Sequence, residues 1–504
     1  MLEAVEVEPG RTLDDYASYA HLAFAVQDLR AEASTLVPAM AKRRVWMVSS
    51  TSRGGGVAEM LPRKVALLRE LGLSVEWIVI TPEEPEFFAL TKKIHNLIHG
   101  SGVALLTAGE HALYESVSQR IADALAPRLG EDDVVVVHDP QPAGMGAILE
   151  RRMPSLVTVW RCHIGHEVTT PETEVAWQLL EPYVTTYDHA VFSATQYIPP
   201  FLAGKSSVIT PAIDPLTPKN RPLSAHHLAG ILCNSALMRE HGPVLRAPFA
   251  QPAQRLRRDG VFVRADDEEE IGILFRPIVT QISRWDRLKG WAPLLDGFAL
   301  LKRHRHRIRG LDALGRRRLE LVRLVLAGPD PASIQDDPEA TEVLDELTNR
   351  YLALEPELQA DVAIISLPMA SSYENALMVN ALQHCATIVV QNSLREGFGL
   401  TVTEAMYKRN AVLGSNAFGL RQQIRDQLDG RLHPAPEDPR VIAEVLIEML
   451  GDARARDRWA RSAQRRVHEE FLIFGQLRKW LRLLARAKGG TVLQRPPDAL
   501  PPGV

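Results

Sequence analysis

Short apolar runs rich in valine and isoleucine alternate with amphipathic segments along most of the chain. The runs are typical of strands buried in a sheet, and the segments between them repeat apolar residues at helical spacing. A helical segment is predicted over residues 1–40. The predicted strands cover residues 44–50, 74–80, 133–137, 156–160, 190–193, 207–210, 278–283, 321–328, 362–365, 386–391 and 411–413. This alternation predicts an α/β fold built on doubly wound parallel sheets.

The length of 504 residues fits two or three domains. We expect an N-terminal Rossmann-like domain over residues 1–221, completed by a C-terminal helix at about 467–487. A second Rossmann-like domain is expected over 277–466. Residues 222–276 break the alternation with prolines, arginines and an acidic run, which predicts an atypical insertion or linker. The proline-rich tail at 488–504 is expected to be disordered.

The composition excludes several classes of protein. A net charge of −4 argues against a broad nucleic-acid surface, so any anion site has to be built locally. Cys162, Cys233 and Cys385 lie far apart, which rules out a disulfide framework and suits a reducing compartment. No apolar run has the length of a membrane span, and the acidic N-terminus lacks an apolar signal core. We therefore expect a soluble cytoplasmic protein without a nucleic-acid partner or a membrane span.

The stretch at residues 394–406 carries the strongest candidate chemistry. Glu396 and Glu404 lie on either side of a Gly-Phe-Gly turn. A helix is predicted behind the turn, with Thr401 as its N-cap and Glu404 three residues later, as in a capping box. Glycines let a ligand approach the backbone closely, and a helix N-terminus presents N–H groups to an anion. The stretch therefore predicts a site for a phosphate-bearing ligand.

Spacing argues against glycoside hydrolysis by these two acids. Glycosidases place their two carboxyl groups roughly 5 Å or roughly 6.5–9.5 Å apart, whereas eight residues of helix rise ~12 Å. Glu396 and Glu404 are therefore expected to bind different parts of one elongated ligand. The alternative is that Glu404 only caps its helix and that Glu396 is a surface acid.

Two cations follow the predicted strand at residues 278–283. Arg284 offers a planar guanidinium and Lys289 a point charge, and together they suit a diphosphate at the carboxyl edge of a parallel sheet. The alternative is a solvated basic turn.

Polar residues also follow three strands of the N-terminal half. A glycine loop at residues 54–56 follows the first strand, His138 and Asp139 end another, and Cys162 and His163 follow the next. Parallel α/β sheets bind ligands at this edge. The alternatives are a plain tight turn and hydrogen-bonded structural histidines. Cys162 has no evident base partner, so we do not expect it to act as a nucleophile.

Together these segments resemble retaining GT-B glycosyltransferases of family 4, in particular the trehalose glycosyltransferring synthases. The Glu-x7-Glu element marks the broad family, whereas HDPQP and WRCHI point to the trehalose-forming branch. The matching segments are GGGVAEML (54–61), FFALTKKIHNLIHG (87–100), VHDPQP (137–142), WRCHI (160–164), PAIDPLTPKN (211–220), TQISRWDRLK (280–289), VNALQ (379–383) and QNSLREGFGLTVTE (391–404). The resemblance implies two Rossmann-like domains facing across a cleft, with an insertion between them.

The resemblance also implies roles at the matching positions of a donor site. Arg284 and Lys289 would bind the donor diphosphate and offset charge on the leaving group. Glu396 would contact the donor glucose, and Glu404 would hydrogen-bond the nucleotide ribose. The backbone N–H groups that would meet the phosphates belong to Phe398, Gly399 and Leu400.

Other matching positions concern the acceptor and the reaction. His163 would lie at the reacting centre, and Asp139 would border the acceptor together with Gly54, Gly55 and Gly56. Such enzymes require no metal or other cofactor, because the two cations and the helix end would stabilise the departing diphosphate. Retention would follow if that phosphate took the acceptor's proton on the same face.

The leading interpretation is a retaining glycosyltransferase that moves glucose from a nucleoside-diphosphate glucose to a sugar acceptor, with glucose as acceptor giving trehalose. One alternative is a trehalose phosphorylase using glucose 1-phosphate, and another is a non-catalytic sugar-nucleotide sensor or scaffold. A homo-oligomer is also possible. Two departures from the family bear on specificity: Gly165-His166 stands where the family tends to carry an acid, and residues 418–421 replace a Gly-Gly-Ile-Pro loop.

Overall fold

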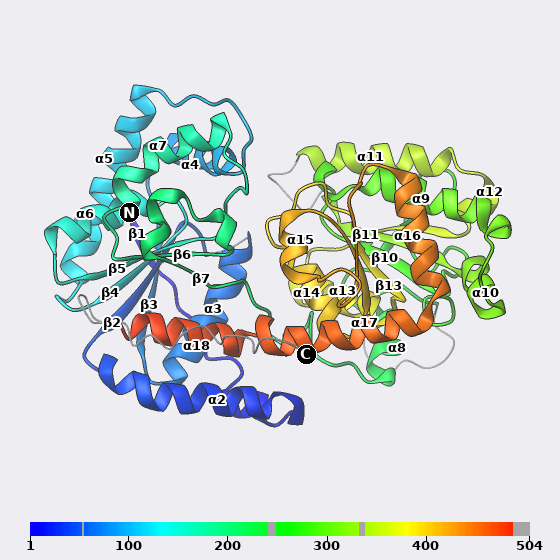
Figure 1. The fold of residues 1–504 in the computed structure, drawn as a ribbon, viewed down its shortest axis with the longest axis horizontal. Helices are drawn as coiled ribbons and strands as arrows, with labels where there is room; N and C mark the ends of the chain where they lie inside the picture. The colour runs from blue at the N-terminus through cyan, green and yellow to red at the C-terminus, as the bar shows by residue number, and fades with distance from the viewer. Residues whose placement is uncertain (53–54, 240–247, 332–337, 487–504) are drawn as a thin grey trace. The chain divides into compact units, whose positions relative to one another are not determined.

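The computed structural model describes residues 1–52, 55–239, 248–331 and 338–486. The chain divides into two units, one formed by Met1–Thr210 with Ile473–Val504 and the other by Pro211–Leu472. Each unit contains one largely parallel sheet with helices on both faces (Figure 1). The α/β class expected from the alternating pattern is confirmed. Within the described ranges, no helix combines the length and the apolarity needed to cross a membrane.

The sheet of the first unit has the strand order β1-β3-β2-β4-β5-β6-β7. Its neighbouring strands run parallel, apart from the edge strand β1, which pairs antiparallel with β3. β4 is buried along its whole length, because helices cover both faces of the sheet. The strands are β1 (Leu2–Ala4), β2 (Arg44–Ser49), β3 (Ser74–Ile80), β4 (Val134–His138), β5 (Val157–Cys162), β6 (His189–Phe192) and β7 (Ser206–Val208).

Helices from both ends of the chain cover this sheet. α2, α3 and α18 lie on one side, and α4 to α7 lie on the other (Figure 1). The helices are α1 (Leu13–Ala17), α2 (Ala20–Leu36), α3 (Gly55–Glu70), α4 (Pro85–Ile98), α5 (Ala108–Leu125), α6 (Ala143–Arg152), α7 (Pro171–Val184) and α18 (Ile473–Leu484). α18 buries Phe474, Leu477, Trp480 and Leu481 on one face, as expected of an amphipathic helix. A basic residue on its other side, Arg478, donates to Glu32 of α2 at 2.6 Å.

The sheet of the second unit has the order β15-β14-β13-β10-β11-β12-β8-β9. The strands from β10 to β15 pair in parallel, whereas β8 and β9 add an antiparallel hairpin at one edge. The strands are β8 (Gln254–Leu256), β9 (Phe262–Arg264), β10 (Ile278–Ile282), β11 (Arg323–Pro329), β12 (Val362–Leu367), β13 (Ile388–Gln391), β14 (Ala411–Ser415) and β15 (Arg431–His433). The parallel part has the doubly wound arrangement that the sequence predicts.

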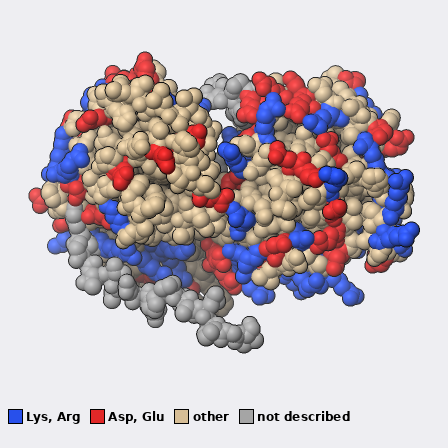
Figure 2. Space-filling view, turned by 45° about the horizontal axis from the view of Figure 1, so that its top comes forward, with Lys and Arg blue, Asp and Glu red and all other residues tan. Residues whose placement is uncertain are grey.

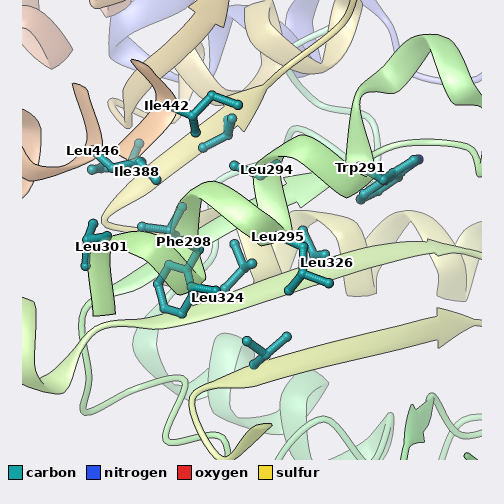
Figure 3. Packing of buried hydrophobic residues seen from close by; sticks show 14 of the residues in the cluster. Trp291, Leu294, Leu295, Phe298, Leu301, Leu324, Leu326, Ile388, Ile442 and Leu446 are labelled. Carbon is teal, nitrogen blue, oxygen red and sulfur yellow. The ribbon is translucent and has the colours of Figure 1, made fainter. Parts of the chain in front are cut away.

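Helices pack on both faces of the second sheet as well. On one face, Phe298 and Leu294 of α9 pack with Ile442 and Leu446 of α16 against Leu324 of β11 (Figure 3). The helices are α8 (Ala225–Asn234), α9 (Trp291–His304), α10 (Ala313–Leu321), α11 (Pro338–Leu352), α12 (Pro356–Gln359), α13 (Ser372–Cys385), α14 (Leu400–Tyr407), α15 (Phe418–Gln423), α16 (Pro439–Gly451) and α17 (Ala453–Arg466). This packing fixes the strand ends that carry the candidate donor residues.

The structure places two segments differently from the sequence-based expectation. Residues 222–276 are not a separate body, because α8, β8 and β9 lie within the second unit and Ile231 and Leu232 belong to its core. Residues 1–40 are not wholly helical, since β1 precedes α1 and α2. The short length of β1, β8 and β9 explains why no strand was predicted there. The expected tail at 488–504 lies outside the described residues.

Candidate active-site residues

Glu396 follows the end of β13, and three side chains donate hydrogen bonds to its carboxylate. Its Oε2 accepts from Lys289 Nζ at 2.8 Å, from Ser393 Oγ at 3.0 Å and from Gln391 Nε2 at 3.3 Å. The Glu396 side chain is 13% exposed. It is therefore not a surface acid, and its carboxylate is positioned rigidly by three separate groups.

Backbone contacts fix Lys289 beside this carboxylate. Gln281 of β10 donates from Nε2 to the Lys289 carbonyl at 2.8 Å and accepts from Asn392 N–H at 2.8 Å. Gly290 follows with a φ of +61°, and a Cβ there would lie 2.2 Å from the Asn392 carbonyl oxygen. Only glycine permits this close approach of the loops after β10 and β13. The ion pair thus depends on two adjacent parallel strands and one glycine.

Arg284 has a fixed backbone and an exposed side chain. Trp291 Nε1 donates to its carbonyl at 3.1 Å, and the neighbouring Trp285 is fully buried. Within the described parts of the chain, the guanidinium has no hydrogen bond or ion pair. Arg284 therefore presents a planar set of donors at the end of β10 that can bind an anion.

The turn before α14 differs in detail from the predicted one. α14 begins at Leu400 with Gly399 as its N-cap, at a φ of +85°, so Thr401 is not the N-cap and the predicted capping box does not form. Gln423 of α15 donates from its side-chain amide to the carbonyls of Phe398 and Gly399. Gly399 carries no side chain that could accept from the first N–H groups of the helix, so this helix start has no side-chain cap.

Glu404 lies one turn into α14 and is 7% exposed. Its Oε1 lies 3.9 Å from Lys219 Nζ. Lys408, on the next turn, donates to Gln383 Oε1 at 2.8 Å and to Asn220 Oδ1 at 3.2 Å. Glu404 therefore does not cap its helix, and it has different partners from Glu396, as expected of two acids that bind different parts of a ligand.

Lys408 makes the stability of the protein depend on pH. Burial lowers the pKa of Lys408 to about 7, from an ordinary value of 10.5. Between these values the unfolded chain binds a proton that the folded chain does not, so stability rises with pH through this window. The stability conferred by Lys408 is thus lower at pH 7 than at pH 9. We expect Lys408→Met to reduce the rise in urea midpoint between pH 7 and pH 9, measured against wild type.

In the first unit, Asp139 and His163 come together at the ends of β4 and β5. Asp139 Oδ1 accepts from the His163 backbone N–H at 2.8 Å and lies 3.1 Å from His163 Nδ1. Asp139 has a φ of +65°, which points its carboxylate at the neighbouring strand end. Burial lowers the pKa of His163 to about 4, although Asp139 opposes this effect. The ring is therefore neutral near pH 7 and donates from Nδ1 to Asp139.

Three further histidines lie near Asp139. The ring of His138 stacks on that of His163, with centroids 5.3 Å apart and planes 11° apart. His95 and His99, at the end of α4, have centroids 4.9 Å apart, and the charge of Asp139 acts on both. Burial lowers the pKa of all three. The segment FFALTKKIHNLIHG contains His95 and His99, but the spacing alone did not indicate that they approach Asp139.

The structure thus brings some predicted residues together and leaves others apart. Lys289 contacts Glu396, and Asp139 contacts His163. Gly55 and Gly56 form the first turn of α3, whereas Gly54 lies outside the described residues. Sequence reasoning missed Gln391 and Ser393, although both stand in the polar run that directly follows the apolar part of β13. In the described ranges, no group of three or more His, Cys, Asp or Glu residues could hold a metal ion.

Two family models match the chain over most of its two sheets. Residues 47–199 match the N-terminal domain of trehalose synthase. Residues 265–466 match the glycosyl transferases of group 1. The first match contains Asp139 and His163, and the second contains Arg284, Lys289 and Glu396.

Relatives cover nearly the whole chain. A trehalose synthase of Rubrobacter xylanophilus is 32% identical over 485 residues, which is 96% of this chain and 99% of that protein. A trehalose synthase of Thermococcus litoralis is 31% identical over 438 residues, covering 87% and 89% of the two chains. A trehalose phosphorylase of Grifola frondosa is 25% identical over 474 residues, covering 91% of this chain and 59% of that one.

Solved structures share the fold at low sequence identity. An α,α-trehalose-phosphate synthase (UDP-forming) from Burkholderia xenovorans, in complex with glucose-6-phosphate, aligns with a TM-score of 0.58 at 15% identity, over 88% of this chain and 100% of that one. A structure described as trehalose-6-phosphate from E. coli bound with UDP-2-fluoro glucose aligns with a TM-score of 0.58 at 14% identity, over 88% and 99%. With the relatives above, these matches show that the chain belongs to the GT-B trehalose synthase-like glycosyltransferases.

Proposed function

We propose that this glycosyltransferase moves glucose from a nucleoside-diphosphate glucose to free glucose and forms trehalose with retention at the anomeric carbon. The observation that carries the proposal is the Lys289–Glu396 ion pair, which Gln281 and Gly290 fix, together with the exposed side chain of Arg284 after β10. This arrangement combines cations for a diphosphate with an acid for a sugar hydroxyl. The trehalose synthase relatives support the product.

The donor diphosphate is assigned to Arg284, Lys289 and the N-terminus of α14. A guanidinium binds two phosphate oxygens at once, and an ammonium adds a point charge. The N–H groups of Phe398, Gly399 and Leu400 add the positive end of a helix dipole. Together these groups stabilise the negative charge that develops on the departing diphosphate. The neighbour bound with UDP-2-fluoro glucose supports a nucleotide-sugar donor.

The two acids of the donor site are assigned to different hydroxyl groups. Glu396 is assigned to the hydroxyl groups of the glucose in the sugar donor, because three hydrogen bonds already orient its Oε2. Glu404 receives the ribose hydroxyls of the nucleotide. It is buried on α14 and has Lys219 beside it, so its carboxylate is pre-oriented to accept hydrogen bonds.

His163 is assigned to the reacting centre, and Asp139 to its orientation. A neutral ring that donates from Nδ1 to Asp139 leaves Nε2 as an acceptor for a sugar hydroxyl. Asp139 borders the acceptor together with the glycine loop. No protein group stands as a nucleophile in this scheme, so the diphosphate leaves and takes the acceptor's proton on the same face. The new bond then has the anomeric configuration of the donor.

The test is a matrix of donors and acceptors with product identification. We would incubate the protein with UDP-, ADP- or GDP-glucose and free glucose, and analyse the products by NMR. The expected result is an α,α-linked disaccharide with release of the nucleoside diphosphate. Absence of turnover with every donor, or a product with inverted configuration, would refute the proposal.

One second candidate rests on a specific observation. The similarity to a trehalose phosphorylase of Grifola frondosa favours glucose 1-phosphate as an alternative donor. The same matrix includes glucose 1-phosphate with glucose, and release of inorganic phosphate in that mixture alone would select the phosphorylase. Saturable nucleotide-sugar binding without any product would indicate a sensor or scaffold.

A further inference from the structure

A group of basic side chains is buried under one face of the first sheet, and several of their nitrogens have no hydrogen-bond partner among the described residues. Lys64, His138 and Arg161 are each at most 2% exposed. Both ring nitrogens of His138 and two nitrogens of Arg161, Nε and Nη1, have no hydrogen-bond partner among the described residues. The third nitrogen of the guanidinium, Nη2, donates to Ser193 Oγ at 3.2 Å. Buried polar groups in native proteins are nearly always satisfied, so this group requires an explanation.

These side chains lie close together although they come from different elements. His138 of β4 and Arg161 of β5 are direct register partners, so both side chains leave the same face of the sheet. Lys64 comes from α3, and its Nζ lies 4.7 Å from the centre of the Trp480 ring of α18. α3 and α18 lie on the same side of this sheet (Figure 1). Trp480 Nε1 is a further buried donor that has no partner among the described residues.

One carboxylate beside this group is too little negative charge to balance the positive charges of Lys64 and Arg161. The carboxylate that acts on Arg161 is that of Asp139, whose Oδ1 already accepts twice from His163. Burial and the charge of Arg161 lower the pKa of Lys64 to about 7, and burial lowers that of Arg161 to about 10. Burying cations without a counter-charge is unfavourable. An anion among the donors would remove most of this cost.

We infer that Lys64, His138 and Arg161 form an internal binding site for one monovalent anion of about the size of chloride. The donors suit an anion, since an ammonium and a guanidinium have hydrogen-bond donors but no acceptor atoms. A monovalent ion is favoured over phosphate, because the groups are enclosed and a doubly charged ion is costlier to strip of water. The site lies next to His163, whose ring stacks on His138, and it is independent of the function proposed above.

The experiment measures thermal unfolding of the full-length protein at constant ionic strength, with sodium gluconate replaced stepwise by sodium chloride. Ligand that binds only the folded state raises the midpoint. We expect a rise of about 3 °C or more at saturating chloride. Crystals grown with sodium bromide should show an anomalous peak between Lys64 and Arg161.

Two lysine variants separate this site from a general salt effect. Lys64→Met removes one charge of the site at similar length, and its chloride-dependent shift should fall to less than half of the wild-type shift. Lys408→Met is the matched control, because burial also lowers the pKa of Lys408 to about 7, but its ammonium has hydrogen-bond acceptors. Its chloride-dependent shift should equal that of wild type.

Several outcomes would overturn the inference. An equal wild-type midpoint in chloride and gluconate would overturn it, as would bromide crystals that contain only a water at this position. An undiminished chloride shift in Lys64→Met would place the ion elsewhere. Stabilisation by sodium phosphate but not by chloride would refute the assignment to a monovalent ion. If Lys64→Met fails to fold, the wild-type titration and the bromide peak still decide.

Discussion

Lys289→Ala is expected to lower kcat for glucosyl transfer by about 10²–10³-fold, the usual loss when one preorganised group that stabilises transition-state charge is removed. Lys289 offers its ammonium beside Glu396, and the loop that carries it is fixed by Gln281 and Gly290. The fold should persist, since Glu396 keeps two of its three hydrogen-bond donors. Steady-state rates with the preferred donor, together with circular dichroism, test this expectation.

Arg287→Ala is the matched control for this variant. Arg287 stands in the same short helical turn, Arg287–Lys289, and also carries one positive charge. Its side chain is 53% exposed and pairs with Glu339, Glu342 and Glu346 on the surface. Exposed pairs of this kind contribute little, so the control should keep the wild-type rate. A wild-type rate in Lys289→Ala, or an equal loss in both variants, would show that the charge at Lys289 has no special role.

Glu396→Ala is expected to abolish measurable transfer, a loss of at least about 10²-fold in kcat/KM. The reason is that Glu396 is assigned to the glucose of the donor and not to its nucleotide. Binding of the free nucleoside diphosphate should therefore persist in the variant, which isothermal titration calorimetry can measure. This split between lost transfer and retained nucleotide binding is the specific prediction.

Glu355→Ala serves as the control for the acidic variant. Glu355 lies in the same unit, is 54% exposed and pairs with Arg303 on the surface. It should keep both transfer and nucleotide binding. If Glu396→Ala lost nucleotide binding as well, the carboxylate would act by holding Lys289 and the loop after β13, and the assignment to the sugar would be wrong.

Most strands that could be predicted from sequence lie inside the sheets, but the edge strand β7 was predicted too, and the edge strand β15 was not. β4 and β12 are buried on both faces, and this burial requires the continuous apolar runs that mark them in the sequence. β1, β8 and β9 are edge or next-to-edge strands of three residues each. Such short strands depend on a partner for their conformation, so their own sequence carries little signal.

The candidate site could be predicted where residue type and strand end coincide. Lys289 and Glu396 follow neighbouring parallel strands, and the structure pairs them at 2.8 Å. The start of α14 was predicted wrongly, because Gly399 takes the left-handed conformation and Leu400 therefore already begins the helix. The contacts of Asp139 with His163 depend on a positive φ in a residue other than glycine, which no local pattern indicated.

Positively and negatively charged side chains are mixed on the surface of the protein. Lys and Arg side chains alternate with Asp and Glu side chains over much of the face shown in Figure 2. With the small net charge of −4, this distribution agrees with anion sites that are built locally from a few residues.

The discontinuous first unit has a consequence for biosynthesis. This unit needs α18, which begins at Ile473, whereas the second unit is one uninterrupted stretch that ends at Leu472. During translation the N-terminal sheet therefore emerges first but cannot complete its fold. The apolar face that α18 will cover remains exposed until α18 has been made. The second unit can mature before the first, although it is translated later. A released chain that ends at residue 472 should accordingly carry a protease-resistant second half and a protease-sensitive first half.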